Sequence, residues 1–188
     1  MLTEESGRQV VPAALTAEHR LDPDAIDRAL AGSGARLVML CSPHNPTGTV
    51  HTAEELAAVA AVAEARGAAV VVDEIHGPLV PEGVRFTPYL SLTDRGFVVT
   101  SASKAYNLAG LKAAVIVPGE ASAGTVAALP DLGRWGASLI GCIAHEAAWH
   151  GGDDWLAAVN ANIRSNVVFV GDLLAALLPA AHLVVPES

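Results

Sequence analysis

Short apolar segments alternate along this chain with segments that carry helix signals, and this alternation limits the fold more than any other feature. Apolar runs rich in valine are typical of strands that are buried on both faces of a parallel sheet. Helices between such strands cover the two faces of the sheet. The sequence therefore predicts an α/β fold with a mostly parallel sheet flanked by helices. The expected strands are residues 8–14, 36–41, 68–72, 97–100 and 113–117, with the start of another at 181–185.

Two helices have clear start signals. Asp22 stands directly before Pro23, so we expect Asp22 to cap a helix whose first position is Pro23. Thr52 and Glu55 have the spacing of a capping box, which predicts a second helix that ends at Gly67. The remaining helices are expected within residues 120–178, broken near Pro130, Gly141 and Gly151-Gly152 and ended by Pro179.

Composition excludes several classes of function. The net charge of -9 disfavours nucleic acid or an anionic membrane surface as the main partner. Aromatic residues make up only 4% of the chain, too few for a platform that stacks bases. No apolar run approaches the roughly 20 residues of a membrane span, and no secretory signal is visible. Cys41 and Cys142 lie far apart without metal-ligand spacing, so we expect a cytoplasmic protein with no metal site.

Polar stretches follow three of the expected strands directly. Asn45 lies in the first stretch (residues 42–48), Asp73 begins the second (residues 73–76), and Lys104 ends the third (residues 101–104). Ligands of open α/β sheets bind beyond the carboxyl ends of the strands, so neighbouring strands would bring these three side chains into one crevice. Each stretch alone also fits a plain turn, a helix cap or a surface lysine. Their joint appearance favours a shared site.

Pyridoxal phosphate is the cofactor whose chemistry fits this set. It needs a lysine for an imine, a carboxylate at the pyridine nitrogen, and hydrogen bonds to its phenolic oxygen and its phosphate. Lys104 can supply the amine once burial or a nearby cation activates it. We expect Asp73 at the ring nitrogen and Asn45 at the phenolic oxygen. The hydroxyl groups of Ser101 and Ser103 are expected to donate to the phosphate.

Two alternative chemistries would use parts of the same stretches, and the sequence lacks the further motifs that each of them needs. Ser101 and Lys104 also spell S-x-x-K, the signature of serine–lysine penicillin-binding enzymes. That chemistry needs S-D-N and K-T-G motifs, and the sequence contains neither. A nicotinamide-binding domain would need G-x-G-x-x-G after the first strand, which NPTG does not supply.

The three stretches resemble the signatures of the class I/II aminotransferase superfamily, the fold-type I pyridoxal-phosphate enzymes. The matching residues are Asn45-Pro46-Thr47-Gly48, Asp73 and Ser101-x-Ser103-Lys104. CSPHNPTG, VDEIH and SASKAYNLAGLK are most similar to the cystathionine β-lyase branch, the MalY/PatB-type C–S lyases. His76 stands where many aminotransferases have tyrosine, as in that branch, and is expected near the cofactor. Lys112 stands where many have a phosphate-binding arginine; it can meet phosphate as a point charge without the arginine fork.

The resemblance implies a pyridoxal-phosphate-dependent C–S β-lyase. Cystathionine or a cysteine S-conjugate would be the substrate, and a thiol, pyruvate and ammonia the products. Lys104 would then be the catalytic residue that removes the α-proton. Amino transfer is the alternative reaction, because it uses the same lysine, aspartate and asparagine. A truncated, non-catalytic fragment of the fold is a third possibility.

The resemblance covers only about the middle half of such an enzyme. It implies an incomplete large domain that binds the cofactor (residues 1–150), followed by a connecting helix and the start of a truncated small domain (residues 151–188). No residue matches the family's substrate-carboxylate arginine or its ring-stacking aromatic. The resemblance also implies a homodimer. An apolar content of 52% agrees with a surface that other segments or a partner chain would cover.

Several further residues are expected to have structural roles. We expect His44 and Glu74 to support the site from behind, and His145 and His150 to be ordinary helix residues because their spacing suits no metal. The three tryptophans are expected to be packing residues: Trp135, Trp149 and Trp155.

Overall fold

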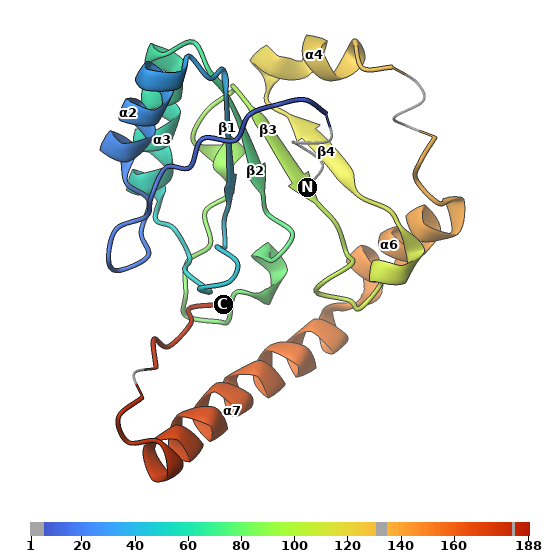
Figure 1. Cartoon of the computed structure of the whole chain (residues 1–188). Coiled ribbons are helices and arrows are strands. Elements are labelled where there is room, and N and C mark those ends of the chain that lie inside the picture. Colours follow the sequence, from blue (N-terminus) through green and yellow to red (C-terminus); the bar gives the residue numbers. More distant parts are fainter. Residues whose placement is uncertain (1–5, 131–134, 182) are drawn as a thin grey trace.

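Four strands form one sheet in the order β1-β2-β3-β4 in the computed structural model, which describes residues 6–130, 135–181 and 183–188 (Figure 1). β1, β2 and β3 are parallel neighbours, and β4 runs antiparallel to β3. This arrangement confirms an α/β fold with a mostly parallel sheet. The strands are β1 (Leu37–Cys41), β2 (Ala69–Asp73), β3 (Phe97–Thr100) and β4 (Val115–Pro118).

Helices α2 (Pro23–Ser33) and α3 (Ala53–Ala65) lie side by side next to the sheet (Figure 1). Both begin where the sequence predicts. The Asp22 side chain accepts a hydrogen bond from the Ala25 N–H at 3.0 Å, which satisfies one of the free donors of the first turn. The capping box of α3 is complete, since the Thr52 hydroxyl accepts from the Glu55 N–H and the Glu55 carboxylate accepts from the Thr52 N–H.

The second half of the chain is helical, as expected, with one predicted break in the wrong place. Gly152 separates α6 from α7, which confirms the break at Gly151-Gly152. Gly141, in contrast, lies in the first turn of α6, where its N–H donates to the Ser138 hydroxyl at 3.2 Å. The helices are α4 (Ala123–Ala127), α6 (Leu139–Gly151) and α7 (Asp153–Leu177); single 3-10 turns are η1 (Gly77–Leu79), η2 (Tyr89–Ser91), η3 (Ala109–Leu111) and η4 (Glu120–Ser122).

Two expected strands are wrong. Residues 8–14 run as an exposed segment without a ladder partner, and a hollow of about 910 Å³ lies between residues 8–15 and β1. Residues 181 and 183–185 form no strand either, and residue 182 lies outside the described residues. A strand exists only when another strand satisfies its backbone groups, so an apolar run without a neighbour stays irregular.

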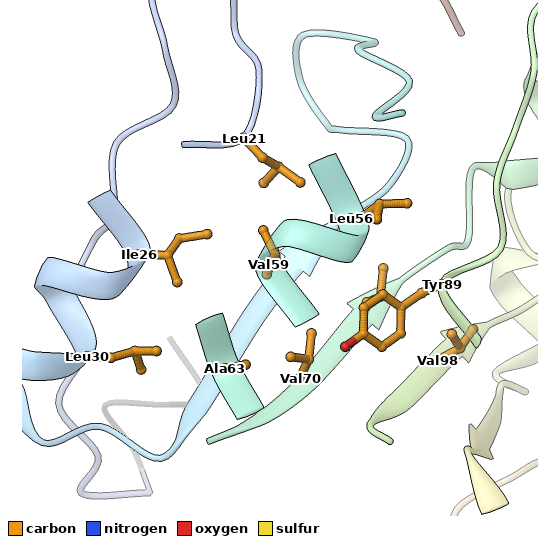
Figure 2. Close-up of a cluster of buried hydrophobic side chains, with 10 residues drawn as sticks. Leu21, Ile26, Leu30, Leu56, Val59, Ala63, Val70, Tyr89 and Val98 are labelled. Carbon is orange, nitrogen blue, oxygen red and sulfur yellow. The ribbon is translucent and has the colours of Figure 1, made fainter. Parts of the chain in front are cut away.

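The core lies between the sheet and helices α2 and α3. Leu56, Val59 and Val72 are completely buried, and Tyr89 from η2 is only 1% exposed (Figure 2). These residues come from α3, β2 and the segment before β3, so the core holds the three parallel strands against one helix layer. The buried cluster consists of Leu21, Ile26, Leu30, Leu56, Val59, Ala63, Val70, Val72, Tyr89 and Val98.

Large apolar side chains are exposed elsewhere on the molecule. Leu37 and Met39 of β1 alternate with Val38 and Leu40, which pack on the core, and the first two are 49% and 64% exposed. The tryptophans, which are expected to be packing residues, are also exposed, although Trp149 contacts the His145 ring. Their exposed fractions are 77% for Trp135, 41% for Trp149 and 51% for Trp155. None of the helices in the described part of the chain is long and apolar enough to cross a membrane.

The core predicts a contrast between two leucine truncations. Leu56→Ala should lower the free energy of unfolding by about 2–5 kcal/mol, because it removes a fully buried side chain and leaves a cavity. Leu177→Ala, at a side chain that is 68% exposed in α7, should change it by less than about 0.5 kcal/mol. Urea denaturation of the two variants checks this, and equal losses would contradict the assigned core.

Candidate active site

The in-register pairing of β1, β2 and β3 brings three loops to one edge of the sheet. Asp73 is paired with Cys41 on one side and with Val99 on the other. The pairing continues past the strand ends, since the Ser42 N–H donates to the Asp73 carbonyl and the Glu74 N–H donates to the Val99 carbonyl, both at 2.9 Å. Because the strands are parallel, the three polar stretches predicted from the sequence all begin at this edge.

The loop after β1 is held by its own hydrogen bonds. The His44 N–H donates to the Thr49 carbonyl at 2.8 Å. The Thr47 hydroxyl lies 2.8 Å from both His44 Nδ1 and the Thr49 hydroxyl. These contacts use His44 inside the loop, in agreement with its expected structural role, and leave the Asn45 side chain exposed.

The end of β2 presents Asp73, and the loop that follows it turns Glu74 inward. Asp73 is half-buried, and its Oδ1 accepts from the Ile75 N–H at 3.0 Å. Glu74 is buried, accepts from the Tyr89 N–H at 2.6 Å, and has its pKa raised by burial. Glu74 thus supports the fold, as expected. Asp73 is the other carboxylate at this strand end, and it is less buried than Glu74.

The charge of Asp73 also acts on the end of β1. Burial and then the nearby Asp73 carboxylate raise the pKa of the Cys41 thiol. A raised thiol pKa disfavours the thiolate, so Cys41 is a poor candidate for a nucleophile.

The loop after β3 is held by Ser101. Its hydroxyl donates to the Ala113 carbonyl at 2.8 Å and accepts from the Ser103 N–H at 3.0 Å, and the residue is 2% exposed. The single hydroxyl proton is therefore already used within the loop. This bond points to Ala113 and not to the Lys104 amine, so it gives the serine–lysine alternative no support. Lys104 is exposed.

Lys112 reaches the same edge of the sheet from the opposite direction. β4 is antiparallel to β3, with Thr100 opposite Val115, so the residues just before β4 lie beside the end of β3. Lys112 has a left-handed backbone, φ 52°, and its carbonyl accepts from the Ser138 N–H at 3.1 Å. Its side chain is exposed.

All seven candidate residues thus lie at one edge of the sheet, Asp73 as the last residue of β2 and the other six in loops, with different degrees of burial. Asn45, Lys104 and Lys112 are exposed, Asp73, His76 and Ser103 are half-buried, and Ser101 is buried. Lys104 was expected to be activated by burial or by a nearby cation, and the described chain does not bury it. Within the described residues, no three His, Cys, Asp or Glu side chains lie close enough to hold one metal ion.

Sequence analysis missed an ion-pair network behind the first loop. The Arg20 guanidinium donates to both carboxylate oxygens of Glu55 at 2.6 and 2.7 Å, to Glu187 at 3.0 Å, and to the Val50 carbonyl at 3.0 Å. Hydrogen bonds to Glu55 raise the pKa of Arg20, so the network stays charged. The sequence had identified Glu55 only as a helix cap. Partners 35 and 167 residues apart leave no local signal.

A buried histidine lies beside this network. His51 is 0% exposed, and neither ring nitrogen has a hydrogen-bond partner among the described residues. Its Nδ1 is 3.8 Å from a Glu55 oxygen, yet burial dominates and lowers the pKa of His51 to about 4. At neutral pH the ring is therefore an uncharged packing residue.

Comparisons of sequence and of structure with known proteins point to the same family. The family model for class I and II aminotransferases matches residues 2–164. A Mycobacterium tuberculosis protein whose name assigns it, provisionally, to the cystathionine beta-lyases is 44% identical over 191 residues, covering 97% of this chain and 47% of the relative.

Two solved structures share the fold. The PLP-bound C-S lyase from Staphylococcus hominis superimposes with a TM-score of 0.88 at 26% identity, covering 98% of this chain and 48% of that one. The N-succinyldiaminopimelate aminotransferase from Mycobacterium tuberculosis gives 0.78 at 28% identity, covering 93% and 47%. The chain thus spans about half the length of the relatives it matches.

The buried histidine generates a pH prediction. Between about pH 6.5 and pH 4 the unfolded chain binds a proton at His51 that the folded chain does not. Stability therefore falls as the pH decreases through this window, by at most about 1.4 kcal/mol per pH unit. His51→Leu removes this contribution and loses no hydrogen bond, so its free energy of unfolding should depend less steeply on pH. Urea denaturation at pH 7, 6 and 5 measures both slopes, and an unchanged slope would contradict the assignment.

Proposed function

The chain belongs to the class I and II aminotransferase family, and from that premise we propose that it carries the cofactor half of a pyridoxal-phosphate-dependent C–S β-lyase. The substrate would be cystathionine or a cysteine S-conjugate, and the products a thiol, pyruvate and ammonia. One observation carries this proposal: an amine, a carboxylate and an amide lie at or just beyond the carboxyl ends of three neighbouring parallel strands. The name of the 44% identical relative supports the lyase over other reactions of the family.

The donor set fits the cofactor. Lys104 would hold the aldehyde carbon, Asp73 the ring nitrogen, and Asn45 the phenolic oxygen. The sequence contains only two lysines, Lys104 and Lys112, so Lys112 is the only other lysine that could bind the aldehyde carbon. Asp73 Oδ1 accepts from the Ile75 N–H, whereas Oδ2 has no hydrogen-bond partner among the described residues, which leaves that oxygen for the ring.

The phosphate would be held by the groups that remain free on the lysine loop. Ser101 uses its proton on the Ala113 carbonyl, so we assign it to holding the loop and, if that bond gives way, to the phosphate. Within the described residues, the side chains of Ser103 and Lys112 make no hydrogen bond, and they would contact the phosphate directly. His76, half-buried at the start of η1, would lie beside the ring.

The chain's own residues would move one proton and hold another. When bound, the cofactor supplies an electron-withdrawing ring that stabilises negative charge on the substrate α-carbon. The Lys104 amine would take the α-proton, because it is the basic group of the donor set. Asp73 would keep a proton on the ring nitrogen, and Asn45 would orient the ring.

Amino transfer is the second candidate function. The likeness to the N-succinyldiaminopimelate aminotransferase supports it, since that fold match also covers most of this chain. A fragment without catalysis is the third candidate. The exposure of Lys104 and Asn45 favours it, because a complete site would shield both from water.

We also propose the larger assembly. Residues 1–150 would form part of the cofactor domain, and residues 151–188 the connecting helix and the start of a small domain. A homodimer in the cytoplasm, acting on a small amino acid, is the corresponding complete enzyme. Apolar residues exposed on β1 and α7, among them Met39 and Phe169, support further covering segments.

Lysine substitutions test cofactor binding. Purified chain mixed with pyridoxal phosphate should develop a visible absorption band that Lys104→Ala abolishes. Lys112→Ala is the matched control: it should keep the band and weaken the apparent affinity for the cofactor, because it removes only a phosphate contact. Absorbance titration measures both. No band with the unaltered chain would favour the non-catalytic fragment, and loss of the band only in the Lys112 variant would reverse the assigned roles.

Substrate tests separate the two reactions. If the chain is a lyase, the loaded protein should release pyruvate from cystathionine without a keto acid acceptor. Turnover that requires an acceptor would instead identify the aminotransferase. Pyruvate formed without an acceptor, measured with a coupled dehydrogenase, and glutamate formed from added 2-oxoglutarate together make the distinction.

A further inference from the structure

The segment from Gly152 to the end of the chain touches each of the three site loops in turn. In Figure 1, α7 runs below the sheet, and the chain end returns beside the loop after β1. Trp155 contacts the loop after β3, Asn160 the loop after β2, and Glu187 the loop after β1. The order of these contacts along the chain is thus the reverse of the order of the strands.

The first contact lies next to the lysine. The Trp155 indole N–H donates to the Ala105 carbonyl at 3.1 Å, one residue after Lys104. Trp155 is 51% exposed, so ring burial accounts for only part of its role. The approach is close, because a Cβ at Gly152 would overlap the Tyr106 ring. The start of α7 is therefore fitted to this loop.

The second contact lies next to the aspartate loop. The Asn160 side-chain N–H donates to the Pro78 carbonyl at 3.2 Å, in the turn that follows His76. The other side-chain atom, Oδ1, is buried and has no partner in the described part of the chain. An unpaired buried oxygen costs stability. An asparagine at this position therefore does little for stability. Its hydrogen bond to the Pro78 carbonyl, which holds the loop, gives a better reason for it.

The third contact lies behind the asparagine loop. The Glu187 carboxylate accepts from the Val50 N–H at 2.7 Å and from Arg20 at 3.0 Å. The backbone N–H groups of Glu187 and Ser188 both donate to the Gly48 carbonyl, at 2.9 and 3.0 Å. The chain end thus closes on the loop that carries Asn45.

We propose that Trp155, Asn160 and Glu187 are positioning residues, which hold the three site loops in one arrangement. Each side chain bonds a main-chain group of its loop, so the loop's own side chains stay available for the site. The role of this arrangement in cofactor binding rests on the proposed function. The holding of the loops does not, and it can be measured without the cofactor.

Hydrogen exchange on the full cofactor-free chain is the first measurement. Trp155→Phe should accelerate amide exchange in residues 101–108, Asn160→Ala in residues 74–80, and Glu187→Ala in residues 44–50. The loss of one net hydrogen bond predicts acceleration of about 2- to 12-fold in the matching loop. Matched controls at exposed positions, expected to leave all three loops unchanged, are Trp149→Phe, Asn162→Ala and Glu82→Ala.

Cofactor titration is the second measurement, because a merely structural role would not move it. Each of the three variants should weaken pyridoxal phosphate binding by about 2- to 12-fold and shift the pH midpoint of the visible band, while the controls keep both values. Trp155→Phe keeps an aromatic ring without the indole N–H and is expected to fold, as circular dichroism would verify.

The outcomes separate the two proposals. Unchanged exchange in all three loops would overturn the positioning role. Accelerated exchange with unchanged cofactor affinity and pH midpoint would reduce these residues to structural contacts and overturn it as well. If the unaltered chain shows no visible band, the proposed function fails, and the exchange data still decide whether the segment holds the loops.

Discussion

Backbone hydrogen bonds hold Asp73 between Cys41 and Val99, and this pairing sets the level at which three strands end. Every candidate side chain of the site lies at that edge of the sheet, Asp73 at the end of β2 and the others in the adjoining loops. A slip of one residue in β2 would turn Asp73 to the opposite face and expose Val72, which is now completely buried. The packing of β2 against α3 and the position of the site carboxylate therefore depend on the same register.

The Glu55 carboxylate and Arg20 connect the first site loop to the helix layer. Glu55 completes the capping box of α3 by accepting from the Thr52 N–H, and it also accepts from Arg20. Arg20 in turn contacts the Val50 carbonyl and Glu187. A change at the start of α3 would thus reach the loop of Asn45 through charged hydrogen bonds, which are stronger than neutral ones.

Several side chains at the candidate site and on α7 are exposed to solvent. Lys104 and Asn45 are exposed, and so are Val168, Phe169 and Val170 on α7, a helix with no buried residue among those described. Contiguous exposed apolar side chains usually mark an interface. The relatives that match this chain are about twice as long.

Signals within a few residues determined much of this protein from its sequence. Asp22 and the Thr52 box place two helices, the valine runs place β2 and β3, and the polar residues after them mark the site edge. Residues 8–14 look equally like a strand and are not one, since a strand needs a partner that local sequence cannot supply. Only the tertiary structure decided that Ser101 bonds Ala113, that Trp155 reaches Ala105, and that Glu187 closes on Val50. These contacts join positions 12 to 137 residues apart, and which atoms meet over such separations depends on how the whole chain packs.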